Sequence, residues 1–191
     1  MAVPSRVPID PADRMTDSAT AQRTVDVTRT YLRMLRATAL KPVEIADPRL
    51  TFGRIEECDV ARARAFYRSI GDRWHWHDRN RWSDAEYTNY LARPGLSLWV
   101  LRFGDDDAGY VEIERHGDGS VEIVLFGLMS RYFGRGFGKH LLTCAVRAAW
   151  SMGPHTVWLH TCTLDSPHAL PNYLKRGFVA YREERYTTTL A

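Results

Sequence analysis

Residues 131–142 read RYFGRGFGKHLL, in which Gly134, Gly136 and Gly138 stand immediately before an apolar run with helical spacing. Glycine loses more conformational freedom on folding than any other residue. So many glycines together indicate either a tight turn or a stretch of backbone that approaches a ligand closely. A helix that begins within this run presents unpaired N–H groups at its positive end, which is a site for a phosphate group.

Two common phosphate-binding patterns do not fit this stretch. A P-loop requires G-x-x-x-x-G-K-[ST], but Phe133 stands at the position of its first glycine and His140 follows Lys139. A dinucleotide-binding turn requires a third glycine where Lys139 stands. Two interpretations remain: a plain strand-to-helix turn, and an anion-binding turn to which Arg135 and Lys139 add positive charge.

The segments on either side of the turn alternate between strand and helix patterns. The expected strands lie at residues 25–34, 49–57, 96–103, 109–116, 121–129, 156–164 and 177–186. The three central segments are separated by short turns rich in Gly and Asp, which predicts an antiparallel meander. Helices are expected after Asp59, after Ser83 with Glu86 in a capping box, after the glycine turn, and over 166–176 with Ser166 as N-cap.

The bulk composition is that of a globular protein. The chain has 191 residues, of which 45% are hydrophobic and 26% charged, so we expect one domain with a substantial core. The polar, Pro-bearing residues 1–23 predict a flexible tail. Residues 24–191 then form the domain, with 24–49 as an additional N-terminal strand and loop.

Charge and cysteine content exclude several classes of protein. A net charge of +3 gives no argument for nucleic acid as a partner. The three cysteines, Cys58, Cys144 and Cys162, are too widely spaced for a disulfide scaffold or a zinc site. No apolar run has the length of a signal sequence or a membrane span, so we expect a cytoplasmic location and no membrane partner.

The order of these segments, together with YLKRGF at 173–178, resembles the GNAT superfamily of acetyl-CoA-dependent N-acetyltransferases. The resemblance covers about residues 50–186 and is sharpest over 120–178. The superfamily's pyrophosphate signature, Q/R-x-x-G-x-G/A, aligns with FGRGFG at 133–138. Gly136 and Gly138 then take its glycine positions, and Phe133 stands where Gln or Arg is usual.

The resemblance implies an α/β (α+β) fold with a mixed, mostly antiparallel sheet of about six to seven strands and helices on both faces. The sheet is expected to splay between its fourth and fifth core strands, where the coenzyme enters. The chain leaves little room for the usual seventh strand after residue 186. We therefore expect the additional strand at 25–34 to join the sheet.

Acetyl-CoA is the co-substrate that the resemblance implies, with no metal. Thioester and pantetheine are expected along Phe126, Gly127 and Leu128, with Gly127 forming a β-bulge that separates its strand from the next. The pyrophosphate is expected on the glycine turn, formed by Phe133, Gly134, Arg135, Gly136, Phe137, Gly138 and Lys139.

Acetyl transfer to an amine needs a group that accepts the amine's proton and one that protonates the departing thiolate. Glu122 is the first candidate for the base, because EIVLFGL resembles the Glu-bearing strand of the histone acetyltransferases in this superfamily. Glu112 and His160 are the alternatives. Tyr173, in the Y-x-K-x-G-F pattern, is the candidate acid. A solvated strand Glu and a packed helix Tyr are the ordinary interpretations of the same residues.

Cys162 could carry an acyl group in a ping-pong mechanism. No activating residue adjoins it, so a small strand residue is the preferred interpretation.

The segment RWHWHDRNRW at 73–82 follows the first expected helix, where the superfamily has its acceptor loop. Trp74 and Trp76 are candidates for an acceptor pocket, with Glu112 and His160 as further substrate-binding residues. Core packing is an equal alternative for each Trp. His75, His77 and Asp78 form only a weak metal-binding pattern.

The expected acceptor is a small-molecule amine or a protein amine, and the expected assembly is a monomer or homodimer. Phe133, and Pro171 inside the last helix, leave one alternative open: a catalytically degenerate acyl-CoA-binding sensor or interaction module. A nucleotide-binding protein is a third alternative.

Overall fold

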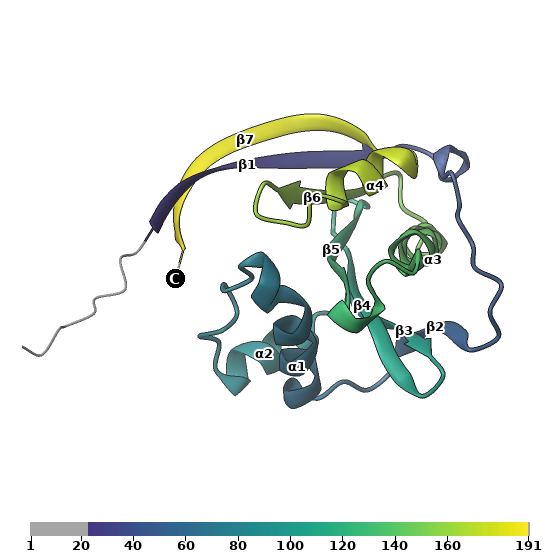
Figure 1. Cartoon of the computed structure of the whole chain (residues 1–191), viewed down its shortest axis with the longest axis horizontal. Helices are drawn as coiled ribbons and strands as arrows, with labels where there is room; N and C mark the ends of the chain where they lie inside the picture. The colour runs from purple at the N-terminus through teal and green to yellow at the C-terminus, as the bar shows by residue number, and fades with distance from the viewer. Residues whose placement is uncertain (1–22, 191) are drawn as a thin grey trace, which may run out of the picture.

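The computed structural model describes residues 23–190, which form a seven-stranded sheet in the order β2-β3-β4-β5-β6-β1-β7 (Figure 1). The strands are β1 (Arg23–Met34), β2 (Leu50–Ile55), β3 (Leu96–Phe103), β4 (Asp106–Arg115), β5 (Val121–Leu128), β6 (Val157–Cys162) and β7 (Val179–Leu190). The helices are α1 (Val60–Gly71), α2 (Asp84–Leu91), α3 (Phe137–Ser151) and α4 (Ala169–Lys175), with short 3₁₀ turns η1 (Ala37–Ala39), η2 (Asp72–Trp74) and η3 (Ser130–Tyr132).

The sequence also predicts a flexible N-terminal tail and no membrane span. The predicted tail at residues 1–23 lies outside the described residues, apart from Arg23, which begins β1. Among residues 23–190, no helix combines the length and the apolar character that a membrane crossing requires.

The sheet is antiparallel except between β5 and β6. These two strands run parallel and pair only at Val121 with Val157 and at Glu122 with Trp158. Beyond this point they separate (Figure 1), so each loses its partner on that side. This confirms the predicted splay between the fourth and fifth core strands, counted from β2.

Strand β1 lies between β6 and β7, antiparallel to both. The prediction that the N-terminal strand joins the sheet is therefore confirmed. It also explains why β7 extends beyond the predicted end at residue 186: Arg23 of β1 pairs with Leu190, so the length of β1 supports the longer strand.

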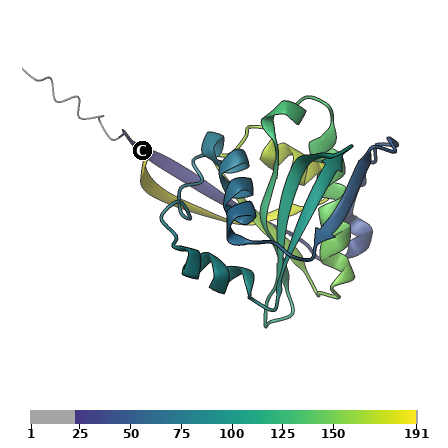
Figure 2. The ribbon, with the colours of Figure 1, turned by 90° about the horizontal axis from the view of Figure 1, so that it is seen from below.

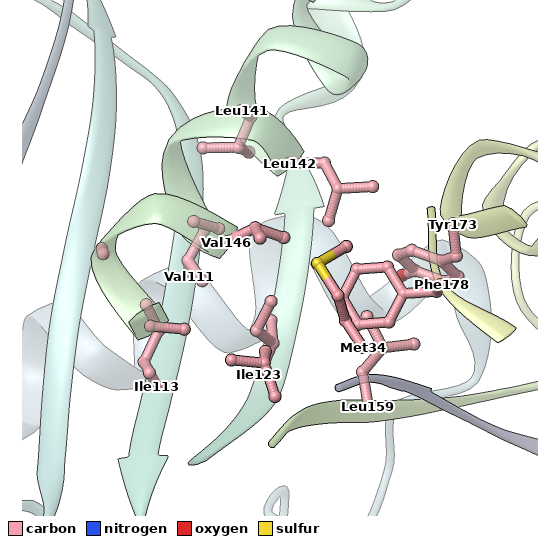
Figure 3. Close-up of a cluster of buried hydrophobic side chains, with 14 of the residues drawn as sticks. Met34, Val111, Ile113, Ile123, Leu141, Leu142, Val146, Leu159, Tyr173 and Phe178 are labelled. Carbon is pink, nitrogen blue, oxygen red and sulfur yellow. The ribbon is translucent and has the colours of Figure 1, made fainter. Parts of the chain in front are cut away.

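Each face of the sheet carries two helices, as expected, with α3 and α4 on one face and α1 and α2 on the other (Figures 1 and 2). Side chains alternate along β4, so Val111 and Ile113 point toward α3 while Tyr110 faces α1. Figure 3 shows the cluster on the α3 side, where Leu141 and Val146 pack on the strands.

The first two helices begin as the sequence predicts. Asp59 caps α1 by accepting a hydrogen bond from the Arg62 N–H at 2.7 Å. Ser83 and Glu86 form the capping box of α2, in which each side chain accepts from the other residue's backbone N–H.

The last helix begins later than predicted. Its first residue is Ala169 and its N-cap is His168, so Ser166 is not the cap. Ser166 instead opens a turn, and its carbonyl accepts from the Ala169 N–H at 2.8 Å. Pro171 explains the difference, because it lacks an N–H and is tolerated only in the first turn of a helix. The later start places Pro171 in that turn.

Candidate active site

The glycine turn leaves a run of backbone N–H groups without acceptors. Gly134 and Gly136 have φ of +76° and +78°, a left-handed conformation that favours glycine, and Gly136 is the N-cap of α3. Within residues 23–190, the N–H groups of 134–138 donate to no other group of the chain. Such a turn at the positive end of a helix fits a diphosphate.

Side chains around the turn hold it in place and add charge. Phe137 is buried and packs on Phe103 and Tyr132, with ring centroids 5.3 and 5.9 Å away. The Gly138 carbonyl accepts from the Asn172 side-chain amide at 3.2 Å, which connects the start of α3 to α4. Arg135 and Lys139 are not buried, so both cations are available to an anion at the turn.

Phe133 is exposed to 40% of its surface. The Arg73 guanidinium lies 5.8 Å from its ring centroid. Phe133, Leu128 and Trp74 also line a pocket of about 160 Å³ between the end of α1 and the glycine turn. The residue that departs from the pyrophosphate signature thus contacts the predicted acceptor segment.

The end of β5 carries the three residues expected along the coenzyme. Phe126 faces α4, with its ring centroid 6.0 Å from that of Tyr173. Leu128 lies beside the start of α3, where a Cβ on Gly138 would be 3.6 Å from its Cδ1. Gly127 faces α1, and a Cβ there would lie 2.2 Å from Cγ2 of Ile70.

The predicted bulge exists, but it is not at Gly127. Gly127 pairs in regular register with Tyr110. The register of β4 and β5 shifts between Glu112, which pairs with Leu125, and Ile113, which pairs with Ile123, so Val124 is the extra residue. The expectation for Gly127 is therefore wrong. The glycine serves the close approach of α1 instead.

Glu122 lies where β5 and β6 begin to separate, on the face of the sheet that carries α1. It is 9% exposed. Its Oε2 is 3.1 Å from His116 Nε2, and its Oε1 is 3.9 Å from His160 Nε2. Burial raises the pKa of the Glu122 carboxyl, and the hydrogen bond with His116 opposes part of that rise. A raised pKa brings a carboxylate base closer to neutral pH.

Glu112, the first alternative base, lies in a buried network. It is 1% exposed. Its carboxylate accepts hydrogen bonds from Arg79 Nη1 at 3.0 Å, the Tyr110 hydroxyl at 2.9 Å and the Tyr90 hydroxyl at 2.5 Å. With these partners the carboxylate is held inside the layer between α2 and β4. This arrangement, with Glu112 buried and three hydrogen bonds to its carboxylate, favours a structural role.

His160, the second alternative, is on β6 beside Glu122. Burial lowers the pKa of its imidazole, with a further contribution from Arg29, which keeps the ring neutral near pH 7. Its ring centroid is 5.7 Å from that of Tyr31 on β1. His160 therefore lies beside the candidate base, with its Nε2 3.9 Å from Glu122 Oε1.

Tyr173 is on the opposite face of the sheet, between Phe126 and Phe178. It is 6% exposed, and burial raises the pKa of its phenol, so the hydroxyl stays protonated well above neutral pH. Within residues 23–190 the hydroxyl has no hydrogen-bond partner. It can therefore donate to a ligand.

Cys162 ends β6 in the same region. Burial and the nearby Asp165 raise the pKa of its thiol. A protonated thiol is a poor nucleophile, which argues against a covalent acyl intermediate on this residue.

The two candidate tryptophans of the predicted acceptor segment, Trp74 and Trp76, differ in their surroundings. Trp76 packs on Tyr67 at 5.7 Å between ring centroids, and a Cβ on Gly71 would overlap its ring. Trp74 is half-buried and lines the pocket beside Phe133. His75 and His77 lie 5.9 Å apart, and the part of the chain that the structure describes contains no cluster of three metal-binding side chains.

The sequence did not indicate His116. This residue follows β4 and lines an open pocket of about 470 Å³ together with His155, Trp158 and Tyr181. The sequence feature that could have indicated its contact with Glu122 is the hairpin HGDGS, in which the His116 N–H donates to the Ser120 carbonyl. That pairing places His116 diagonally opposite Glu122. Only the register of the hairpin reveals the contact.

The sequence comparisons agree with this geometry. Residues 63–178 match the family model described as the acetyltransferase (GNAT) family. A mycothiol acetyltransferase from Corynebacterium efficiens is 32% identical over 121 residues, which is 59% of this chain and 40% of the relative. The chain thus spans less than half of the length of the curated relative that it matches.

Solved structures show the same fold. A GCN5-related N-acetyltransferase from Sphaerobacter thermophilus superposes with a TM-score of 0.63 at 15% identity, over 88% of this chain and 53% of that one. A Bacillus subtilis acetyltransferase in complex with CoA gives 0.52 at 24% identity, over 67% and 75%. With its splayed sheet, its glycine turn and a family match over residues 63–178, the chain belongs to the acetyltransferase (GNAT) family.

Proposed function

We propose that this protein is an N-acetyltransferase that moves the acetyl group of acetyl-CoA directly to a primary amine. One observation carries the proposal. The strand β5 has Glu122 at the start of the splay and leads, at its other end, to the unpaired N–H groups of residues 134–138. A single strand thus connects a candidate base to an anion-binding turn.

The residues present fit acetyl-CoA. The diphosphate would lie on the N–H groups of 134–138, with Arg135 and Lys139 neutralising its charge. Pantetheine would follow Phe126, Gly127 and Leu128 into the opening between β5 and β6. When bound, the coenzyme supplies the thioester that is attacked.

The two candidate catalytic side chains lie on opposite faces of the splayed sheet. A primary amine is mostly protonated near neutral pH, so Glu122 first takes a proton from the ammonium group through a water molecule. The free amine then forms a C–N bond to the thioester carbon. As the C–S bond breaks, the nitrogen loses its second proton to water, and Tyr173 gives its proton to the departing thiolate. Tyr173 then regains a proton from water, and Glu122 releases its own to solvent, so one proton is released per acetyl group transferred.

The acceptor would approach from the α1 face, where Glu122 and His160 lie and where Trp74 lines a pocket. The curated relative is named for acetylation of mycothiol. We propose a small-molecule amine as the first acceptor class for this chain, and a protein amine as the second.

The test combines binding and turnover on the full chain. Calorimetry measures acetyl-CoA affinity, and a thiol-release assay follows a panel of a small alkylamine, a polyamine, an aminoglycoside, an amino acid and a lysine peptide. Amine-dependent thiol release supports the proposal. Binding without turnover on any amine would favour the acyl-CoA-binding module. If ATP competes with acetyl-CoA for binding and CoA does not, the result would favour a nucleotide-binding protein.

A further inference from the structure

His116 lies between the candidate base and the solvent. Its Nε2 is 3.1 Å from Glu122 Oε2, and its ring lines the open pocket of about 470 Å³. The ring also stacks on Trp158, with centroids 5.7 Å apart and planes 28° from parallel. Trp158 is held in turn, because its Nε1–H donates to Ser120 Oγ at 3.3 Å. The imidazole therefore has a fixed orientation toward the carboxylate.

Glu122 needs a partner because of its neighbour on β4. Glu114 pairs directly with Glu122 across the two strands, and two carboxylates in that position repel each other. Glu114 has its own cation, since its carboxylate forms an ion pair with Arg93. The charge of Arg93 also acts on Glu122, but the groups that form ion-pair contacts with its carboxylate are His116 and His160, and the nearer of the two is His116.

We propose that His116 is a positioning residue for Glu122: its Nε2–H orients the carboxylate and keeps it ionised beside Glu114. The inference rests on the proposed function, because it assigns His116 its role through the proposed base. His116 itself contacts no reacting group in this account. It acts only on the orientation and protonation of Glu122.

The direction of the effect follows from the groups that act on Glu122. Burial raises the pKa of this carboxyl, and so does the charge of Glu114, while the hydrogen bond and the charge of His116 lower it, as does the charge of Arg93 to a smaller extent. Removal of the His116 donor deletes the largest of the lowering effects, so the pKa rises further. A base with a higher pKa takes up a proton at a higher pH, and activity on the acidic side is then lost earlier as the pH falls.

Two substitutions separate the hydrogen bond from the stacking. His116→Phe keeps a planar ring on Trp158 but has no N–H, whereas His116→Gln keeps a donor without the ring. His155→Phe is the matched control. It alters the same pocket, and within residues 23–190 His155 forms no hydrogen bond or ion pair with Glu122.

The primary measurement does not require a known acceptor. In full-length protein labelled with ¹³C-glutamate, the carboxyl signal of Glu122 is assigned by its loss in Glu122→Gln and titrated by NMR. We expect His116→Phe to raise the Glu122 pKa by about one unit, a tenfold change in proton affinity, and His116→Gln to raise it less. His155→Phe should leave the titration unchanged.

Rescue by a small molecule gives a second measurement. His116→Ala opens the pocket beside Glu122, and added imidazole should return the Glu122 titration toward that of the wild type. Imidazole should have no such effect on His155→Ala. A role for His116 in packing alone predicts no rescue.

Some results would overturn the inference. An unchanged Glu122 titration in His116→Phe would do so, as would an equal shift in His155→Phe. Failure of the proposed base is a separate result: in that case Glu122→Gln would keep the wild-type pH profile of thiol release, whatever the NMR titration shows.

Discussion

Gly127 on β5 lies so close to Ile70 on α1 that a Cβ on the glycine would stand 2.2 Å from Cγ2 of the isoleucine. Non-bonded carbon atoms in proteins essentially never approach so closely. The absence of a side chain at Gly127 thus lets α1 rest against the strand that carries the candidate base, next to the opening of the sheet.

Gly127→Ala should therefore destabilise the protein. Either α1 moves or Ile70 leaves its preferred rotamer, and overpacking of this kind costs about 1–3 kcal/mol. Urea unfolding measures the change in the free energy of unfolding. Gly53→Ala is the control, because a Cβ there meets nothing within 4 Å.

The Gly127 prediction has a compensating variant. Ile70→Leu moves the branch from Cβ to Cγ and so removes the clashing Cγ2 while conserving volume. The double variant should recover part of the stability lost in Gly127→Ala. If the double variant instead loses the full sum of the stability lost in Gly127→Ala and in Ile70→Leu, that result would contradict the clash.

Gly136→Ala should weaken acetyl-CoA binding. A residue with a side chain is strained at φ +78°, and relief of that strain would redirect the N–H groups at the start of α3. We expect about a tenfold rise in Kd by calorimetry, which corresponds to about 1.4 kcal/mol. Gly153→Ala provides the comparison, since it has φ +69° at the far end of α3 and open space around it. It should lose similar stability and keep its affinity.

Glu122→Gln should lower kcat/KM near neutral pH by about 10²-fold or more, since an amide accepts no proton. In the wild type, activity should fall as the pH drops through the Glu122 pKa, which burial places above the usual range for Glu. A pH–rate profile of thiol release checks both statements, and the variant should lack the acidic limb. Glu56→Gln, a change at an exposed carboxylate, should leave the profile intact.

Tyr173→Phe should slow turnover by about tenfold or more while acetyl-CoA affinity stays within about twofold. The ring keeps its contacts with Phe126 and Phe178, and within residues 23–190 the lost hydroxyl has no partner, so thermal stability should not change. Burial raises the phenol pKa, so no alkaline limb from this residue is expected below about pH 10. A large loss of coenzyme affinity would instead identify Tyr173 as a binding residue.

Glu112→Gln should cost stability without moving the pH profile. It leaves the guanidinium of Arg79, buried with Tyr90 and Tyr110, without its counter-charge. Breaking such a pair costs about 3–5 kcal/mol. Calorimetric unfolding and the thiol-release profile together test this. A shifted acidic limb with little loss of stability would restore Glu112 as the base.

Local signals in the sequence predicted most of the framework. The caps at Asp59 and Ser83 depend on residues three positions apart, and the glycine turn depends on φ angles that favour glycine. Such features are decided within one turn of chain. The splay and the place of β1 in the sheet followed from the family resemblance and from the limited length of chain after residue 186.

The errors arose where distant segments meet. The bulge at Val124 depends on the register of β4 against β5, which composition does not determine. Glu112 accepts a hydrogen bond from Arg79, which lies in a loop 33 residues earlier in the sequence. This contact distinguishes Glu112 from Glu122, although the two look alike in the sequence. The late start of α4 could have been predicted from the sequence, because Pro171 is tolerated only in the first turn of a helix.

Strand β1 has a consequence for how the protein is made. The family match begins at residue 63 and ends at residue 178, yet β6 and β7 lie on either side of a strand that starts at Arg23. During synthesis, β1 leaves the ribosome more than a hundred residues before its partners β6 and β7, so it cannot pair until they are made. Pairings between segments so far apart in the sequence form slowly. A fragment trimmed to the matched segment would expose the edge of β6. A fragment made for expression should therefore keep everything from residue 23 onward.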